Sequence, residues 1–398
     1  MFSAVPDAGD HGLLPRWVAP LVALIGIATA AVALDSTLPA HQWWGRIAIG
    51  GYVVGLAMSF HPRTRRWWWA WCSIACGLAP LVFLVIARAR GWHHVAQSEV
   101  DVIESGARRL LHHGTPYQDP AHLSHRAARN NYSYFPYLPL LTVPGLPRAI
   151  LGTHWFTDAR IYLSLVDVGC GWFAWRRLSA RGRIVLVTIA ASPVVTLLMA
   201  AGGHDLFIVS FLLLGFVGVT AGFGISASFS LLSWPMVLPF GFVRKFDIRR
   251  AALIAGIVAV ASIPILVSPK AAWANLVKFP AGSTPAVSPA DAPSLGHLLE
   301  KLPGGKAIDF LLLVVIVGAL GISLLRRPPA TMGAAAGRAA IAFTALIVSV
   351  PATRTGYLVH PILLGGLAWA AGRDARDAVR TGPRPGSRVT TEGPSPSD

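Results

Sequence analysis

The chain has 398 residues, of which 54% are hydrophobic and only 13% are charged, and its mean hydropathy is +0.56. A soluble domain carries about 25% charged residues, so the composition excludes an ordinary soluble domain. The formal net charge is +16, but the arginines stand in short runs between apolar blocks. Such runs are typical of cytoplasmic loops. They argue against a nucleic-acid partner and indicate anionic membrane lipids instead.

Long apolar blocks repeat along the chain. They are about 17 to 22 residues long, the length that a helix needs to cross about 30 Å of hydrocarbon. Tryptophans at the block edges fit the aromatic belt of a membrane surface. We therefore expect an all-α, polytopic protein. Spans are predicted at 17–34, 43–60, 67–87, 157–175, 183–200, 204–222, 250–267, 307–325, 339–353 and 356–371.

The arginine runs set the expected orientation. They begin at Arg63, Arg176, Arg244, Arg326 and Arg373. The positive-inside rule places all of them in the cytoplasm, together with both termini. This requires block 223–243 to enter and return, as two short spans or as a re-entrant hairpin, and its Pro235 and Pro239 would interrupt a helix.

The same orientation predicts the domain organisation. The chain would cross the membrane about ten to twelve times in a single domain, 1–371. Two long polar segments, 88–156 and 268–306, would lie at the outer face of the plasma membrane. The tail 372–398, rich in Arg, Pro, Gly and Ser, is expected to be disordered and cytoplasmic.

The first outer segment holds a predicted amphipathic helix that begins near Ser98. Carboxylates at 99, 101 and 104 fall within two turns, and apolar residues at 107, 110 and 111 follow at helical spacing. Gly114 and Pro116 would end this helix, which we expect to lie on the outer membrane surface. Farther on, 134–152 combines aromatic residues with closely spaced prolines, and we expect it to be partly inserted.

Short motifs in this segment and after it resemble a known family. The motif residues are Ala107, Leu110, Leu111, Gly114, Pro116 and Tyr117, then Tyr134, Pro136, Tyr137, Pro139 and Leu140. With an acidic residue ahead of them, they resemble the polyprenol-phosphate-mannose-dependent mannosyltransferases of glycosyltransferase family 87. That family belongs to the C-type membrane glycosyltransferases. The turn at Gly203-His204-Asp205 and the stretch from Pro351 to His360 also resemble motifs of this family.

The resemblance implies an activity. Family members transfer a hexose, here mannose, from a polyprenyl phosphate to a lipid or glycan acceptor on the outer face of the membrane. An acidic residue of the first outer loop acts as general base. Its usual position points to Glu99, whereas its usual residue type points to Asp101. Residues two apart lie on different sides of a helix, so both cannot serve equally; we favour Asp101 and keep Glu99 beside it.

The remaining site residues also follow from the resemblance. Arg354 and His360 are the candidates for binding the donor phosphate, because nearby cations would stabilise the departing charge. The substrate-pocket candidates are Tyr117, Tyr134, Tyr137, His204 and Asp205. No cofactor is expected, and a divalent metal is possible but not required. Cys72, Cys76 and Cys170 lie inside apolar blocks and are interpreted as packing residues.

Other interpretations stay open. The carboxylates could form a solvated helix face, Arg354 could be an arginine whose charge reaches the interface, and His204 and Asp205 could form a polar turn. A transporter or a lipid-linked-sugar flippase is the main alternative function, since it would carry ionisable residues at mid-membrane depth. The few candidates for that, Arg46, Asp158, Arg160 and Asp167, lie mostly near block ends, and clustered carboxylates in a long outer segment favour an enzyme. A scaffold without catalysis is the third possibility.

Overall fold

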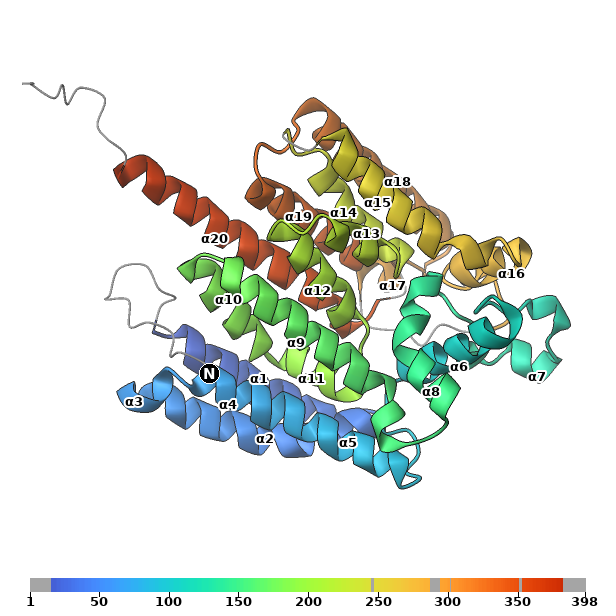
Figure 1. The fold of residues 1–398 in the computed structure, drawn as a ribbon, viewed down its shortest axis with the longest axis horizontal. Coiled ribbons are helices and arrows are strands. Elements are labelled where there is room, and N and C mark those ends of the chain that lie inside the picture. Colours follow the sequence, from blue (N-terminus) through green and yellow to red (C-terminus); the bar gives the residue numbers. More distant parts are fainter. Residues whose placement is uncertain (1–15, 245–246, 287–293, 301, 351–352, 382–398) are drawn as a thin grey trace, which may run out of the picture.

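All regular structure in the described residues is helical (Figure 1). The computed structural model describes residues 16–244, 247–286, 294–300, 302–350 and 353–381. For this part of the chain, the prediction of an all-α protein is confirmed. The end of the predicted cytoplasmic tail, 382–398, lies outside the described residues.

The first helices of the chain pack into one group. They are α1 (Val18–Leu34), α2 (Pro39–Phe60), the short α3 (Pro62–Arg65), α4 (Trp68–Cys72) and α5 (Ala79–Ala89). A π-helical stretch, Ser73–Leu78, joins α4 to α5, so that Trp68–Ala89 is one continuous helix. These helices agree with the predicted spans 17–34, 43–60 and 67–87 to within a few residues.

Small residues let the helices of this group approach closely. A Cβ added at Gly51 or Gly55 of α2 would lie 2.6 or 2.5 Å from the sulfur of Cys76 or Cys72, respectively. Such contacts between glycine and a neighbouring helix are common in membrane proteins. Both cysteines are buried and free, as is Cys170, in agreement with the interpretation as packing residues.

The following elements surround a second, larger core. They are α6 (Ser98–His113), α7 (His125–Ala128), α8 (Leu146–Leu151), α9 (Ala159–Arg177), α10 (Ala180–Ala190), α11 (Pro193–Ala201), α12 (Asp205–Phe216), α13 (Ala221–Ala227) and α14 (Trp234–Gly241). The chain continues with α15 (Ile248–Ala261), α16 (Pro269–Trp273), α17 (Leu295–Glu300), α18 (Gly305–Arg326), α19 (Met332–Ser349) and α20 (Val359–Thr381). The second core consists of buried side chains from α6, α9, α12, α14, α19 and α20.

Two predicted spans differ from the observed helices. The predicted span 183–200 is not one continuous helix: α10 and α11 meet there at an angle of 56°, and together they are long and apolar enough for one bent span. Pro193 begins α11, and a proline cannot continue the preceding helix because it lacks an N–H and clashes with the turn before it. The helix observed in the predicted span 204–222 is shorter than predicted, because α12 ends at Phe216.

Block 223–243 is interrupted as predicted, but the break lies before Pro235, which stands in the first turn of α14; Pro239 lies inside α14, so the prediction that it interrupts a helix is wrong. The block contains the end of α13, a 3-10 turn at Leu231–Ser233 and then α14, so no long helix crosses it. Pro235 lies in the first turn of α14, where a missing N–H costs little. Whether this pair of short helices enters and returns through a membrane stays a prediction.

The last helix continues beyond the predicted domain boundary. The predicted span ended at 371, followed by a disordered tail, but α20 runs on to Thr381. Arg181 of α10 lies 2.9 Å from the Asp374 carboxylate and 2.6 Å from that of Asp377. These ion pairs tie the extra turns of α20 to α10, so residues 372–381 are a helix and the prediction of disorder there is wrong.

Apolar side chains cover much of the outside of the molecule. Exposed examples are Leu21, Leu24 and Ile25 on α1, Leu165 and Val168 on α9, and Phe310, Leu311 and Val315 on α18. A soluble monomer rarely shows such extended apolar patches. Two continuous helices, Trp68–Ala89 and Met332–Ser349, are long and apolar enough to cross a membrane, and the bent pair α10–α11 would make a third.

The two ends of the helical body differ in content. Figure 1 shows α6, α7, α8 and α16 gathered at one end, whereas α3 and the last turns of α20 lie at the opposite end. The first group comes from the two polar segments predicted to lie outside the membrane. The second carries arginines from the runs predicted to be cytoplasmic.

Candidate functional site

The site is built on α6, whose boundaries match the predicted helix. Glu99 and Asp101 lie in its first turn, where negative charge interacts favourably with the helix dipole. Gly114 ends it with φ +70°, in the left-handed region that favours glycine, and its N–H donates to the Leu110 carbonyl at 2.9 Å. The amphipathic helix inferred from the spacing is therefore confirmed as a helix.

Glu99 forms an ion pair with Arg354, a residue that lies much later in the chain. Arg354 sits in the loop before α20, and its Nη1 contacts the Glu99 carboxylate. Ser98 Oγ donates a further hydrogen bond to Glu99 Oε2 at 3.2 Å. The Glu99 side chain is only 6% exposed, and burial lowers the pKa of the Arg354 guanidinium. Each of these two charges needs the other as its partner.

A small cavity opens beside this ion pair. It measures about 20 Å³, which is enough for one water molecule but not for a hexose. Its lining consists of Ser98, Glu99, Val102, Asn131, Tyr132, Tyr134, Pro136, Tyr137, Phe279 and Arg354. A wider, open depression of about 480 Å³ lies next to it, lined among the described residues by Arg129, Asn130, Asn131 and Pro285. Asn131 belongs to both.

Asp101 and Glu99 bind different arginines, Arg88 and Arg354, as expected for residues two apart on a helix. The Asp101 side chain is 47% exposed, and its Oδ1 accepts a hydrogen bond of 2.6 Å from Arg88 Nη2. It lies near the cavity residue Tyr132: partial burial raises the pKa of Tyr132, and the negative charge of Asp101 raises it further. The two candidate bases therefore flank one site, one buried and one accessible.

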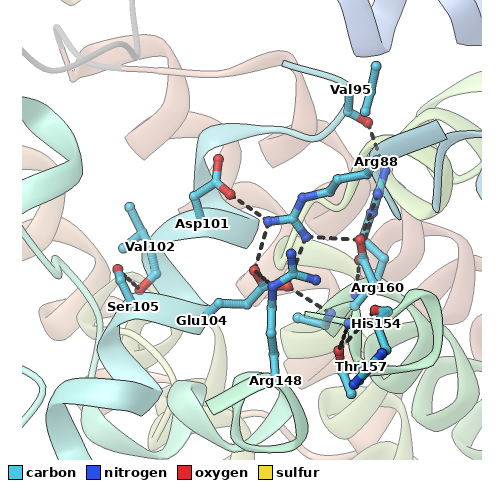
Figure 2. Close-up of polar contacts among 12 residues, drawn as sticks. Arg88, Val95, Asp101, Val102, Glu104, Ser105, Arg148, His154, Thr157 and Arg160 are labelled. Atoms are coloured by element: carbon cyan, nitrogen blue, oxygen red, sulfur yellow. Dashed lines mark hydrogen bonds and ion pairs between the residues drawn. The ribbon is translucent and has the colours of Figure 1, made fainter. Parts of the chain in front are cut away.

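Arg88 binds more than one carboxylate. Its Nη1 lies 2.9 Å from both Glu104 Oε1 and Asp158 Oδ2, and its Nη2 lies 2.7 Å from Glu104 Oε2. Arg148 Nε reaches the same Glu104 carboxylate at 3.1 Å. Figure 2 shows Arg88 between Asp101 and Glu104, with Arg148 below them.

Arg160 completes this group of charges from α9. Its side chain is 0% exposed, and it forms a two-point ion pair with Asp158 at 2.9 and 2.8 Å. It also donates to the Val95 carbonyl at 2.9 Å. The sequence had marked Asp158 and Arg160 only as charges near a block end, and it gave no role to Arg88, Glu104 or Arg148. Their positions next to apolar blocks, where an unpaired charge is costly, were the available signal.

The tyrosines divide between the cavity and the layer behind it. Tyr134 and Tyr137 line the cavity, and Tyr134 stacks on Phe279 with ring centroids 4.6 Å apart. Tyr117 does not line it. Its hydroxyl donates to the Tyr137 carbonyl at 3.0 Å, and burial raises the pKa of Tyr117. Tyr117 therefore supports the backbone of a cavity residue from behind.

His204, Asp205 and His360 form a separate buried cluster. Nε2 of each histidine lies 3.9 Å from Asp205 Oδ1, too far for a hydrogen bond. His204 Nδ1 and His360 Nε2 have no hydrogen-bond partner among the described residues. The His204 ring packs against Tyr137 with centroids 4.4 Å apart, so this histidine cluster lies behind Tyr137 and does not line the described cavity.

The predicted residues are thus partly assembled. Glu99, Arg354, Tyr134 and Tyr137 meet at the cavity and Asp101 lies beside it, whereas the other four stand one layer behind. The first residues of the predicted last outer loop, Pro351 and Ala352, lie outside the described residues. No group of three or more His, Cys, Asp or Glu residues in the described ranges is arranged to hold a metal ion.

Comparisons with known proteins add no relative. No family model, no curated protein and no solved structure matches the chain. The likeness to family 87 therefore rests on the sequence motifs, and the case for a function rests on the residues of the site.

Proposed function

We propose that this protein is a polytopic membrane glycosyltransferase of the C-type architecture. It would transfer a hexose, by resemblance mannose, from a polyprenyl phosphate to a hydroxyl of a lipid or glycan acceptor. The observation that carries the proposal is the contact between Glu99 and Arg354. It joins the carboxylate of one family-like motif to the cation of another at one cavity, with Asp101 beside it.

The expected membrane arrangement fits the distribution of side chains. Exposed apolar residues on α1, α9 and α18 would face lipid. The candidate site lies at the end of the molecule that carries α6, α7, α8 and α16, opposite α3 and the last turns of α20 (Figure 1). If arginine-rich α3 is cytoplasmic, the site faces outward.

The reaction assigns a different role to each charged residue. The acceptor oxygen forms a bond to the anomeric carbon, the bond from that carbon to the phosphate oxygen breaks, and its electron pair stays on the phosphate. Asp101 would take the acceptor proton, because its carboxylate is the accessible one. Arg354 would stabilise the charge on the departing phosphate. Glu99, buried against Arg354, would hold that guanidinium in place.

The substrates require the site to open. A cavity of about 20 Å³ cannot hold a hexosyl phosphate, so Tyr132 and the loops around it would have to move. The neighbouring depression at Arg129 and Asn131 is wide enough to receive a polar acceptor group.

The test is sugar transfer by the purified protein in lipid nanodiscs, with labelled polyprenyl-phosphate mannose and membrane lipid extracts as acceptors. We expect protein-dependent transfer that falls by about a hundredfold or more in Asp101→Asn. Asp119→Asn is the matched control, because Asp119 caps a 3-10 turn in the same segment and its recorded ion-pair partner is the exposed His122, 3.9 Å away. Full transfer by both Asp101→Asn and Glu99→Gln would contradict the assignment.

A transporter or lipid-linked-sugar flippase is the second candidate, and one observation favours it. His204, Asp205 and His360 are buried together, and two of their nitrogen atoms have no partner among the described residues. Buried ionisable residues of this kind often mark ion or proton pathways in membrane proteins. Movement of a solute or a lipid-linked sugar across vesicles, without any sugar transfer, would replace the enzyme proposal by this one.

A further inference from the structure

Six charged side chains form a connected network beside the candidate site. Arg88, Arg148 and Arg160 supply the positive charges, and Asp101, Glu104 and Asp158 supply the negative ones. The formal charges cancel. The network joins the end of α5 to α6, α8 and the start of α9, as Figure 2 shows for its labelled members.

Asp101 is the exception within this network. The side chains of Arg88, Glu104 and Asp158 are 12%, 5% and 2% exposed, whereas that of Asp101 is 47% exposed. A purely structural network gains nothing from extending to a half-exposed carboxylate, since exposed ion pairs contribute little stability. Here the buried part ends on the one carboxylate that an incoming hydroxyl could reach.

Arg88 is the link between the buried part and Asp101. Its Nη2 donates to Asp101 Oδ1 at 2.6 Å and to Glu104 Oε2 at 2.7 Å, so one nitrogen serves both carboxylates. Arg148 binds the Glu104 oxygen that Nη2 also contacts. A change of charge at Glu104 or Arg148 would therefore change the electrostatic potential at the Asp101 carboxylate, because Arg88 contacts both Asp101 and Glu104.

We propose that Arg88 is a positioning residue for Asp101, and that Glu104 and Arg148 set the affinity of Asp101 for a proton in opposite directions. This inference rests on the proposed function and assigns a role to three residues outside the predicted site. Arg88 holds Oδ1 and leaves Oδ2 of Asp101 without a hydrogen bond among the described residues, so that this oxygen is the one available to an acceptor hydroxyl.

The charges around Asp101 determine in which direction a change at Glu104 or Arg148 shifts its affinity for a proton. The groups that face it are Arg88 of α5, Glu104 of α6 and Tyr132 of the 3-10 turn at Asn131–Ser133. Asp158 and Arg160 of α9 and Arg148 of α8 stand behind Arg88. Removing the negative charge of Glu104 makes Asp101 easier to deprotonate, whereas removing the positive charge of Arg148 makes it harder.

The first experiment measures the pH dependence of transfer. We expect Glu104→Gln to move the acidic limb of the rate profile to lower pH, and Arg148→Gln to move it to higher pH, each by about half to one unit. The double variant restores the charge balance, so its acidic limb should return to within a few tenths of a unit of the wild type. Arg88→Lys keeps the charge but loses the planar fork, and should lower kcat about tenfold with KM unchanged.

The second experiment does not depend on activity. Protonated carboxyl groups react with a water-soluble carbodiimide, so the pH midpoint for labelling of Asp101, read by mass spectrometry, should move in the same opposite directions. Opposite shifts support the network proposal, even if the wild type transfers no sugar, in which case only the proposed function fails. Shifts of the same sign, or none in variants that remain folded, overturn the network proposal.

Discussion

Two buried polar groups lie close to the same cavity, and they are satisfied to very different degrees. The first is the Arg88 network, which consists of Arg88, Asp101, Glu104, Arg148, Asp158 and Arg160. Each of its buried charges has an opposite partner within 3.1 Å. In the histidine cluster of His204, Asp205 and His360 the closest of the charged contacts is 3.9 Å. A fully paired network fixes the elements that carry it, whereas unsatisfied buried polar atoms are rare enough to require an explanation. The network therefore fixes its part of the site by paired charges, whereas the histidine cluster has no such pairing.

The largest effect is expected where the paired network is broken at its most buried member. Arg160→Gln leaves the nearly inaccessible Asp158 with Arg88 as its remaining cation. Breaking a buried pair costs about 3–5 kcal/mol, so the variant should lose much of its thermal stability or fail to accumulate. The midpoint of unfolding in detergent measures the loss.

A matched control for that variant is Arg250→Gln. Arg250 and Asp247 are 3.9 Å apart and both more than half exposed, so the control should change stability by less than about 1 kcal/mol. Equal losses in the two variants would show that the buried network does not fix the fold.

The Glu99–Arg354 pair should behave as one unit in catalysis. Glu99→Gln leaves the Arg354 guanidinium without its carboxylate, and Arg354→Gln leaves Glu99 buried and unpaired. Each change is expected to lower transfer about tenfold or more, and the double variant should be no slower than the worse single variant, because residues that contact each other are not additive. Initial rates of the four proteins complete the cycle. Losses that multiply in the double variant would contradict a shared role.

The histidine cluster should respond in the opposite way to the network. Asp205→Asn removes a carboxylate that has no close partner charge, so it should cost little stability, about 1 kcal/mol or less. Its activity, in transfer or in transport, should fall if the histidine cluster serves the function. The same unfolding assay compares it with Asp158→Asn, which removes half of a buried pair. A loss as large as that of Asp158→Asn would show that the cluster is a structural element.

Local sequence patterns were enough to predict most of the helices. The amphipathic helix at 98–113 followed from its spacing and from Gly114, and the helices near the apolar blocks followed from their composition. The bend between α10 and α11 had a visible signal in Pro193. The helical turns after 371 did not stand out, because their ion pairs to Arg181 join residues that are far apart in the chain.

The ion pairs of the site could not be predicted from the sequence, because they also join residues that are far apart in the chain. Asp101 and Glu99 could be placed on different sides of one helix by spacing alone, but their partners could not be chosen that way. Arg88 lies before the helix, Arg148 after it, and Arg354 near the far end of the described chain. The register in which α5, α8 and α9 meet α6 decides which cation reaches which carboxylate. That register is a property of the packed helices.

The smallest effect concerns Tyr117, which supports a residue that lies between the cavity and the histidine cluster. Tyr137 lines the cavity on one side and packs against His204 on the other, and its carbonyl accepts a hydrogen bond from the Tyr117 hydroxyl. Tyr117→Phe removes only that hydroxyl, so stability should fall by about 1 kcal/mol. The ring remains packed edge-on against Phe135, which limits the damage. If the hydroxyl fixes Tyr137 between the cavity and the histidine cluster, KM for the donor should rise a few fold with kcat unchanged. An unchanged KM, with the expected loss of stability, would show that Tyr117 supports the fold and leaves the cavity unaffected.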